Sequence, residues 1–530
     1  MAGSLSPLKH KSFAFLWLAA LVSNIGTWMH EVGAGWLMTE LSDNPLMVSL
    51  VAASTSLPVF LFVLVAGALA DILDRRKYLL WTQFYMLLLA IGLTFMTWSD
   101  MMTPWLLLFF TFAIGTGAAL MMPAWDAIIP ELVPRNDLSQ AIALGSIGIN
   151  AARAIGPALA GLIIAASGSY AVFALNTVSF LGVIISLLYW RRNVVDRGMA
   201  PERFIGAIKA GIRFTRYTKS LQIVLLRSGL FFITAIALLA LLPLYVREVL
   251  QGNAQVLGYL QASMGIGAIL TAFVMPLAKK HLSIDSLLFI AAAILSLSFI
   301  MLSMTEHLIL ACIALFTGGM AWIMVFSLLR VKAQETVPNW VRARAMSVML
   351  MVSFGSMALG SAIWGQLVNI IGLQITYAVI APISFIVAFL MIPFSLKNMT
   401  HQNHEQAKEY HQHRKLRVIP NRDEGPIQVT IEYRLSSLKE DDFKYRIHQL
   451  SLIRKRNGAY RWHLFKDLET ENVFVEQFLI EDWEEHERQH ARTSVDEKTI
   501  HDGLISCLED GTQPIVKHYL HSNGRRNHER

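Results

Sequence analysis

Residues 46–77 read LMVSLVAASTSLPVFLFVLVAGALADILDRRK, and this stretch decides what kind of fold the chain has. Its first 25 residues, 46–70, contain no charged side chain. A helix needs only about 20 mostly apolar residues to cross a bilayer. Acidic and basic residues follow at once, as expected where a helix leaves the lipid. The stretch therefore predicts a membrane-crossing helix and the loop that ends it.

The composition of the whole chain fits this interpretation. Of its 530 residues, 54% are apolar and only 16% are charged, whereas soluble domains carry roughly a quarter of charged residues. A soluble enzyme is therefore excluded. The two cysteines, Cys312 and Cys507, lie far apart, which excludes a disulfide framework, a zinc ribbon and a cysteine-ligated cluster.

Similar apolar stretches recur along the first 397 residues, and each is long enough to cross a bilayer. The first is flanked by Lys9 and Lys11 and lacks a small-residue cleavage site, so we expect it to be a retained span and not a signal peptide. An even number of spans places both ends of the chain on one side. The twelve predicted spans are 13–38, 46–70, 79–98, 104–123, 138–165, 170–190, 221–246, 255–277, 284–304, 308–329, 343–369 and 374–395.

Loop charge predicts which side that is. The N-terminus, the loops after even-numbered spans and the start of the tail hold 21 Lys and Arg residues, whereas the opposite loops hold only Arg247. Basic loops stay in the cytoplasm. We therefore expect a multi-pass protein of the bacterial inner membrane with both termini and the central loop in the cytoplasm.

The two sets of six spans resemble each other at a constant offset of 204 residues. Glu131 meets Glu335, and Val133-Pro134 meets Val337-Pro338 in the corresponding loops. Shared apolar composition explains matched glycines, but it explains a matched Glu-x-Val-Pro loop poorly. We therefore predict two related six-helix bundles, an arrangement common in secondary transporters. Further matches are Phe112 with Phe316, Gly115 with Gly319, Ala141 with Ala345, Gly156 with Gly360 and Gly161 with Gly365.

Charge and composition change at the end of the last span. Residues 1–397 have a net charge of +9, whereas residues 398–530 have a net charge of −2. The overall charge of +7 therefore comes from the segments that flank and join the predicted spans, and it does not predict nucleic-acid binding. The predicted organisation is an N-terminal bundle (1–190), a basic loop (191–220), a C-terminal bundle (221–397), a polar linker (398–424) and a small domain (425–530).

The small domain has the pattern of an α+β fold. Apolar residues alternate over 427–433, recur at helical spacing over 443–453, and form strand-like runs at 460–467 and 472–480. A charged helix at 482–500 and a strand near 514–521 complete a βαββαβ order, which is typical of ferredoxin-like domains. The helix contains His486-Glu-Arg-Gln-His490, which matches a zinc-protease pattern, but no third ligand is indicated. We therefore expect no metal and no protease activity.

The loop after the second span resembles a motif of the major facilitator superfamily. It reads Gly67-Ala-Leu-Ala-Asp71-Ile-Leu-Asp74-Arg75-Arg76, which is similar to the family's G-x-L-x-D-x-x-x-R-R signature except at Asp74, where the family often has glycine. The resemblance implies that Gly67, Asp71, Arg75 and Arg76 form a conformational latch and not a cargo site. The simpler alternative is that the basic residues only set the orientation of the chain in the membrane.

The fifth span resembles the motif of the superfamily's antiporter branch. Gly156, Pro157 and Gly161 match its G-P-x-x-G-G core, whereas Ala152 and Ala160 replace two glycines. Together with residues 123–134, the resemblance narrows to the enterobactin-exporter-like branch, also called transmembrane secretion effectors. It implies export of a small amphipathic molecule, such as a siderophore or a drug, in exchange for protons. One departure is Thr111, which stands where many proton-coupled members have arginine.

An ionisable side chain in or beside a membrane span is costly and usually faces a cavity or a partner. Glu31 and Arg153 lie in the middle of the first and fifth spans, whereas Asp126 and Arg227 lie near span ends. We hypothesise that Glu31 accepts a proton or a cation and that Arg153 pairs with it or with an anionic cargo; Asp126 is a weaker candidate. Static ion pairs, or snorkelling of Arg227 and Asp126, are the alternatives.

The expected function is therefore secondary transport of a small molecule across the lipid bilayer, with protons as the coupling ion. No G-x-x-x-x-G-K-[ST] motif occurs, so ATP-driven pumping and a nucleotide cofactor are not expected. An importer with the same fold remains an alternative. The small domain resembles antibiotic-biosynthesis-monooxygenase-like α+β barrels through Trp462, Glu476 and Trp483, which implies a possible homodimer, a cargo-modifying enzyme or a ligand sensor.

Overall fold

The computed structural model describes residues 5–191, 204–338, 340–396, 418, 420–436, 439–492, 494–509 and 511–521. The chain forms two compact units. The first, called here the helical unit, comprises residues 1–204, 223–332 and 346–399. The second, called here the mixed unit, comprises residues 205–222, 333–345 and 400–530. Within the described residues, twelve helices are long and apolar enough to cross a membrane, which confirms the twelve predicted spans.

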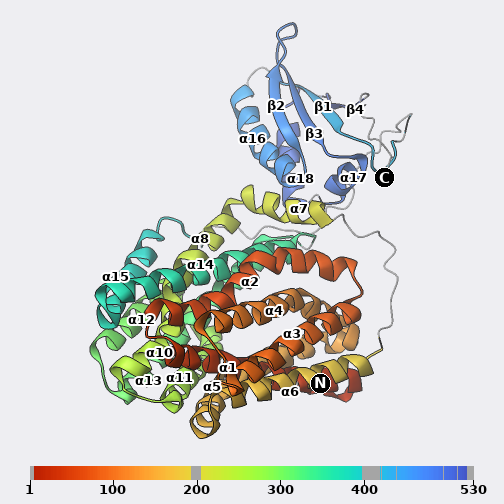
Figure 1. The fold of residues 1–530 in the computed structure, drawn as a ribbon. Helices are drawn as coiled ribbons and strands as arrows, with labels where there is room; N and C mark the ends of the chain where they lie inside the picture. The colour runs from red at the N-terminus through yellow and green to blue at the C-terminus, as the bar shows by residue number, and fades with distance from the viewer. Residues whose placement is uncertain are drawn as a thin grey trace. The chain divides into compact units, whose positions relative to one another are not determined.

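The first six spans are single helices (Figure 1). Three of them follow a residue whose side chain satisfies a free backbone N–H group: Asn44, Asp74 and Thr103 accept hydrogen bonds from the N–H groups of Leu46, Lys77 and Leu106. The helices are α1 (Lys11–Leu41), α2 (Pro45–Ile72), α3 (Arg75–Trp98), α4 (Pro104–Leu132), α5 (Leu138–Ser167) and α6 (Ser169–Tyr189).

Helix α4 extends nine residues beyond the predicted end of the fourth span, to Leu132. The predicted span ended at Pro123. Pro123 and Pro130 nevertheless lie inside the helix. Helices in a membrane tolerate proline because neighbouring helices satisfy the freed groups.

The seventh span is a chain of short helical segments, unlike the other spans. It consists of α8 (Lys219–Ala235), α9 (Ala237–Ala240), α10 (Leu242–Leu244) and a π-helical turn, η3 (Tyr245–Val249). Pro243 lies within α10 and accounts for the break. The remaining spans are α11 (Ala254–His281), α12 (Ile284–Met304), α13 (Leu308–Thr336), α14 (Arg342–Ile371) and α15 (Leu373–Leu390).

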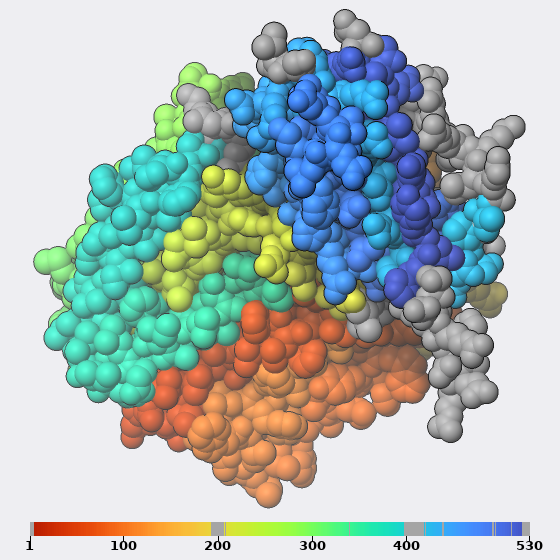
Figure 2. Space-filling model, turned by 90° about the horizontal axis from the view of Figure 1, so that it is seen from above, coloured from red at the N-terminus to blue at the C-terminus, as the bar shows by residue number. Residues whose placement is uncertain are grey.

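The two six-span halves pack against each other along two helix pairs, α5 with α11 and α2 with α14. Gly355 of α14 lies against the ring of Phe60 in α2, and Gly67 of α2 faces Ser347 of α14. Figure 2 shows the red surface of α2 beside the green-to-teal surface of α14. A cavity lies between the halves, beside these two helix pairs.

The mixed unit contains a four-stranded antiparallel sheet in the order β2-β3-β1-β4. The strands are β1 (Ile427–Arg434), β2 (Tyr460–Lys466), β3 (Val473–Ile480) and β4 (Ile515–Leu520). Helix α16 (Glu440–Arg456) follows β1, and this order and connectivity are those of the predicted ferredoxin-like fold. Every second residue of β1 is buried in the core, including Val429 and Tyr433.

The predicted charged helix at 482–500 is instead two helices, α17 (Trp483–Ala491) and α18 (Val495–Ile505). Ser494 begins α18 with a capping box, in which its hydroxyl accepts from the Glu497 N–H and the Glu497 carboxylate accepts from the Ser494 N–H. The mixed unit also includes α7 (Phe204–Arg216) from the central loop and residues 333–345, which join α13 to α14.

Candidate functional site

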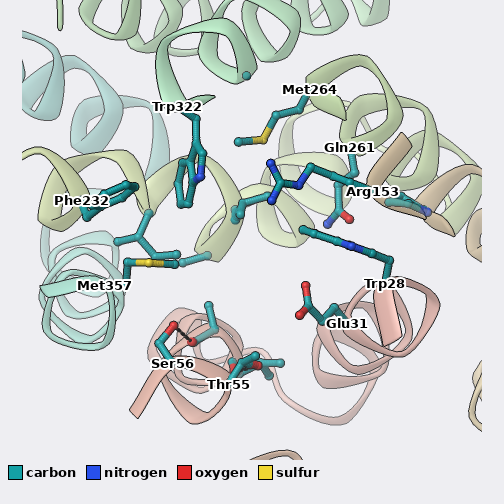
Figure 3. A pocket seen from close by; sticks show the side chains of 18 of the residues that line it. Trp28, Glu31, Thr55, Ser56, Arg153, Phe232, Gln261, Met264, Trp322 and Met357 are labelled. Carbon is teal, nitrogen blue, oxygen red and sulfur yellow. Dashed lines mark hydrogen bonds between the residues drawn. The ribbon is translucent and has the colours of Figure 1, made fainter. Parts of the chain in front are cut away.

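A cavity of about 280 Å³ lies between the two halves of the helical unit. Helices α1, α2 and α5 line it from the first half, and α8 to α11, α13 and α14 line it from the second. Figure 3 shows side chains from both halves pointing into this space. The polar ones are Glu31, Thr55, Ser56, Arg153, Gln261 and Ser353.

Glu31 and Arg153 both line the cavity, as the hypothesis for these two residues requires. The Arg153 guanidinium carbon lies 5.2 Å from the centroid of the Trp28 ring, which is a cation–π distance. Its Nε is buried and has no hydrogen-bond partner among the described residues. Glu31 lies close enough to interact electrostatically with Arg153, although no ion pair within 4.0 Å joins them in the described chain. Each side chain is therefore available to another ligand.

The apolar part of the wall includes aromatic rings and methionine side chains. Trp322 packs edge-on against Phe232, with ring centroids 5.2 Å apart, and Met264 and Met357 also line the cavity. Figure 3 shows these side chains on the side opposite Glu31. Such side chains adapt to apolar groups of varied shape, so the cavity combines an apolar wall with one cation and one carboxylate.

Glycines close the cavity at one end of the helical unit. We call this end the odd-loop face, because it carries the loops that follow odd-numbered spans. A Cβ at Gly161 of α5 would lie 2.7 Å from the Ala254 carbonyl oxygen of α11, and one at Gly258 would lie 2.6 Å from the Pro157 carbonyl oxygen. Asn369 also donates to the Asn44 Oδ1 at 3.1 Å. The two halves therefore meet closely at the odd-loop face.

The antiporter-like motif lies in these helix contacts. A Cβ at Gly156 would lie 2.6 Å from the Cβ of Trp28 in α1, so the glycine lets α1 and α5 approach. Pro157 itself lines the cavity. Gly156 and Gly161 thus bring α5 against a helix of each half and also position Trp28 beside Arg153.

The latch motif is placed within the first half. Arg75 donates to the Glu131 carboxylate at 2.9 Å and to the carbonyls of Ala70 and Ala127. Arg76 donates to the carbonyls of Leu187 and Leu188 at the end of α6, where a cation also interacts favourably with the helix dipole. Gly67 lies in α2, as does Asp71, whose side chain lies outside the described residues.

The structure separates Asp126 from Glu31 and Arg153. Asp126 is exposed and does not line the cavity, and it interacts electrostatically with Arg330 of α13. Arg227, by contrast, forms a buried ion pair: it donates to Asp285 at 2.7 Å and to the carbonyls of Met391 and Phe394. Its partner in α12 lies 58 positions away, and no motif in the sequence connects the two residues.

A sequence profile of one protein family, described as transmembrane secretion effectors, matches residues 2–527. The chain is 23% identical over 387 residues to the staphyloferrin A transporter of Staphylococcus aureus, an alignment that covers 72% of this chain and 96% of that protein. It is 24% identical over 371 residues to the multidrug efflux pump Tap of Mycolicibacterium fortuitum, covering 68% and 90%. It is 22% identical over 292 residues to macrolide efflux protein A of Streptococcus pyogenes, covering 54% and 72%.

Solved transporter structures share the fold of the helical unit. A POT family transporter crystallised with a thioalcohol-conjugated peptide gives a TM-score of 0.62 at 14% identity, covering 74% of this chain and 97% of that one. The nucleoside transporter NupG gives a TM-score of 0.60 at 14% identity, covering 72% and 99%. At these identities the likeness concerns the fold alone.

Proposed function

Because the chain belongs to the transmembrane secretion effector family of major facilitator transporters, we propose that it exports a small amphipathic organic molecule by alternating access. The observation that carries this proposal is the cavity between the halves. It lies where a rocking movement of one half against the other would expose it to each side in turn. Close glycine contacts at the odd-loop face already shut it on that side.

The lining of the cavity supports a cargo that is partly apolar and partly charged. Trp28, Trp322 and the methionines provide apolar surface, whereas Arg153 and Glu31 provide one charge of each sign. Three relatives are named as a staphyloferrin A transporter, a multidrug efflux pump and a macrolide efflux protein. A siderophore or a drug with an anionic group facing Arg153 is therefore the cargo class that we propose.

Glu31 is the group that we propose to couple transport to protons. A nearby guanidinium favours the ionised carboxylate, and a conformational change that moves the two groups apart favours the protonated form. Thr111 stands where other proton-coupled members carry arginine and is buried, with its hydroxyl bonded to the Leu107 carbonyl. Glu31 and Arg153 would therefore perform the proton coupling that the arginine of the fourth span performs in other members.

Replacing Glu31 with Gln tests this role. We expect transport by the variant to lose its dependence on pH, because the amide cannot take up a proton. Asp126→Asn is the matched control, since it removes a carboxylate from another span but leaves the cavity unchanged. Transport measured against pH should therefore change for the first variant only, and an unchanged profile for Glu31→Gln would remove the coupling role.

Direction and orientation are tested by separate measurements. Export predicts that everted vesicles accumulate the cargo, whereas intact cells exclude it; the reverse pattern would support the importer alternative. Cytoplasmic termini predict that a cysteine introduced at Lys444, whose side chain is 52% exposed, is labelled only after the membrane is permeabilised, as the loop charges require.

For the small domain we propose a homodimer formed through the open face of its sheet. One sheet face packs on the helices, whereas the other carries exposed apolar side chains together with Glu432 and Lys517. An isologous pair can match each lysine with the partner's glutamate. Phe465→Glu should make the protein monomeric in native mass spectrometry, and a dimer that persists would contradict this. The exposed apolar residues are Tyr460, Phe465, Ile515 and Tyr519.

A further inference from the structure

A second cavity, of about 580 Å³, lies within the second half of the helical unit. Residues of α8, α12, α13 and α15 line it, and Figure 1 shows α12 and α15 side by side. Among the described residues, none lines both this cavity and the one between the halves. Phe231 of α8 lines the second cavity, whereas the next residue, Phe232, lines the first. We call the second cavity the α12–α15 pocket.

The pocket has a polar end, on the face that carries the loops after even-numbered spans. Arg227 is 8% exposed there and donates to Asp285 at 2.7 Å. Asp285 also accepts from Ser395 Oγ at 2.7 Å and from the Leu396 N–H at 3.0 Å, so its charge is compensated. The buried Arg227 Nε has no hydrogen-bond partner among the described residues. The polar end therefore has more donors than the protein itself uses.

The rest of the pocket is apolar and about as long as one leaflet of a bilayer. It extends along α12 from Ser283 to Ala292, nine positions apart, which corresponds to about 13 Å at a rise of 1.5 Å per residue. The hydrocarbon core of a bilayer is about 30 Å thick, so each leaflet contributes about 15 Å. The pocket therefore has the length of one lipid acyl chain. Its apolar lining includes Leu230, Phe231, Phe289, Val325, Val387 and Met391.

The corresponding space in the first half is filled by side chains. Gly168 and Gly372 lie 204 residues apart and precede α6 and α15 with φ values of 84° and 83°, so the two helices keep the offset of the repeat. Leu187 of α6 belongs to a buried apolar cluster. Met391, its counterpart at the end of α15, lines the pocket instead. Equivalent positions are thus packed in one half and face a cavity in the other.

One aromatic residue accounts for much of this difference. Trp190 follows α6, is 5% exposed and belongs to the same buried cluster. Its counterpart at the offset of 204 residues, Phe394, is 43% exposed and does not line the pocket. Protein interiors are close-packed, and cavities larger than a water molecule are few. The difference between the halves therefore indicates that the second half accommodates an apolar group from outside the chain.

We propose that the α12–α15 pocket binds one membrane phospholipid, with an acyl chain among the four helices and the phosphate at the polar end. Acyl chains surround helices that cross a bilayer, and a phospholipid carries the apolar and polar parts in the order that the pocket requires. Ser283 and Ser286 share one hydrogen bond between their hydroxyls at 2.9 Å, which leaves one hydroxyl hydrogen for a phosphate oxygen. Helix α12 begins beside them, at Ile284, and the start of a helix favours an anionic group.

A phospholipid with a photoreactive group near the end of one acyl chain tests the site in the full-length wild-type protein. The protein is reconstituted in phosphatidylcholine vesicles that contain this lipid, and cross-linked residues are mapped by mass spectrometry. Thr234 and Ala292 are buried and line the apolar part of the pocket, whereas Ala378 of α15 is exposed. We expect at least fivefold more cross-links at the two buried residues. More cross-links at Ala378 than at either buried residue, or equal numbers, would overturn the site.

A diacylglycerol with the same photoreactive chain tests the polar end. It lacks the phosphate, so cross-links at Thr234 and Ala292 should fall roughly tenfold, as expected for the loss of a hydrogen bond to a charged group. Equal cross-linking by the two lipids would overturn the recognition of phosphate.

Ala388→Phe adds a ring to the lining of the pocket from α15 and should reduce the cross-links at Thr234 and Ala292 at least fivefold. Ala378→Phe is the matched control on the same helix, because Ala378 is exposed and lies outside the pocket. Thermal unfolding checks that both variants fold; if Ala388→Phe does not, Ala388→Leu gives the decision. Wild-type cross-linking in the folded pocket variant contradicts the proposal. Since the assay needs no cargo, the lipid site can fail while transport persists, or hold where no transport is found.

Discussion

Adding one methyl group at Gly161 should open the odd-loop face. The Cβ of Gly161→Ala would lie 2.7 Å from the Ala254 carbonyl oxygen and 3.0 Å from the Gln255 Cα. Both are backbone atoms of α11, so no side chain can turn away and the helices must separate. Overpacking of this kind costs about 1–3 kcal/mol. Only the closed conformation bears this cost, so the equilibrium should shift roughly 5- to 150-fold towards the open one, at about 1.4 kcal/mol per factor of ten.

Labelling of a cavity cysteine measures this shift. In a protein with Cys312 and Cys507 replaced by Ser, a cysteine at Thr55 should react faster with an impermeant maleimide added outside intact cells. Gly145→Ala is the control on the same helix, because a Cβ at Gly145 meets nothing within 4 Å. Equal labelling in the Gly161→Ala variant and the control would refute the reasoning that this contact closes the face.

Two further predictions concern the α+β domain. Tyr433→Phe removes the hydroxyl that donates to buried Glu476 at 2.8 Å. A hydrogen bond to a charged group contributes about 2 kcal/mol, so hydrogen exchange of the β1 and β3 amides should accelerate roughly thirtyfold. Unchanged exchange would show that Glu476 finds another donor. Burial, and to a lesser extent the Arg454 guanidinium, lowers the pKa of His501 to about 4. The unfolded chain binds a proton on the His501 imidazole near pH 6.5, whereas the folded domain does not. About 3 kcal/mol of folding stability that is present above pH 6.5 is therefore lost as the pH falls to 4. His501→Gln should make the stability, measured by hydrogen exchange, less dependent on pH in this range.

Hydropathy was sufficient to predict the twelve spans of the helical unit. A bilayer-length apolar stretch has few alternatives to a helix, because lipid offers no hydrogen bonds to the backbone. The predicted fourth span ended too early at Pro123, because a helix in a membrane can continue through proline. The division of the charged segment at 482–500 was readable in principle, since Ser494-x-x-Glu497 has the spacing of a capping box.

The site was predictable only in part, because side chains meet through the packing of distant helices. The cost of burying a charge in lipid was enough to select Glu31 and Arg153, and both line the cavity. The same argument selected Asp126, which does not. The Asp285 partner of Arg227 leaves no trace in local sequence, since the pair depends on which helices become neighbours.

The interrupted seventh span gives the cavity a polar feature that side chains do not supply. Pro243 has no N–H, so the carbonyl group of Leu239, four residues before it, lacks its usual helical donor. Both residues line the cavity. We expect this carbonyl to accept a hydrogen bond from a cargo that carries amide or hydroxyl hydrogens. Alanine scanning would miss such recognition, whereas replacing Pro243 by Ala would restore the donor and should weaken retention of hydrogen-bonding molecules over purely apolar ones.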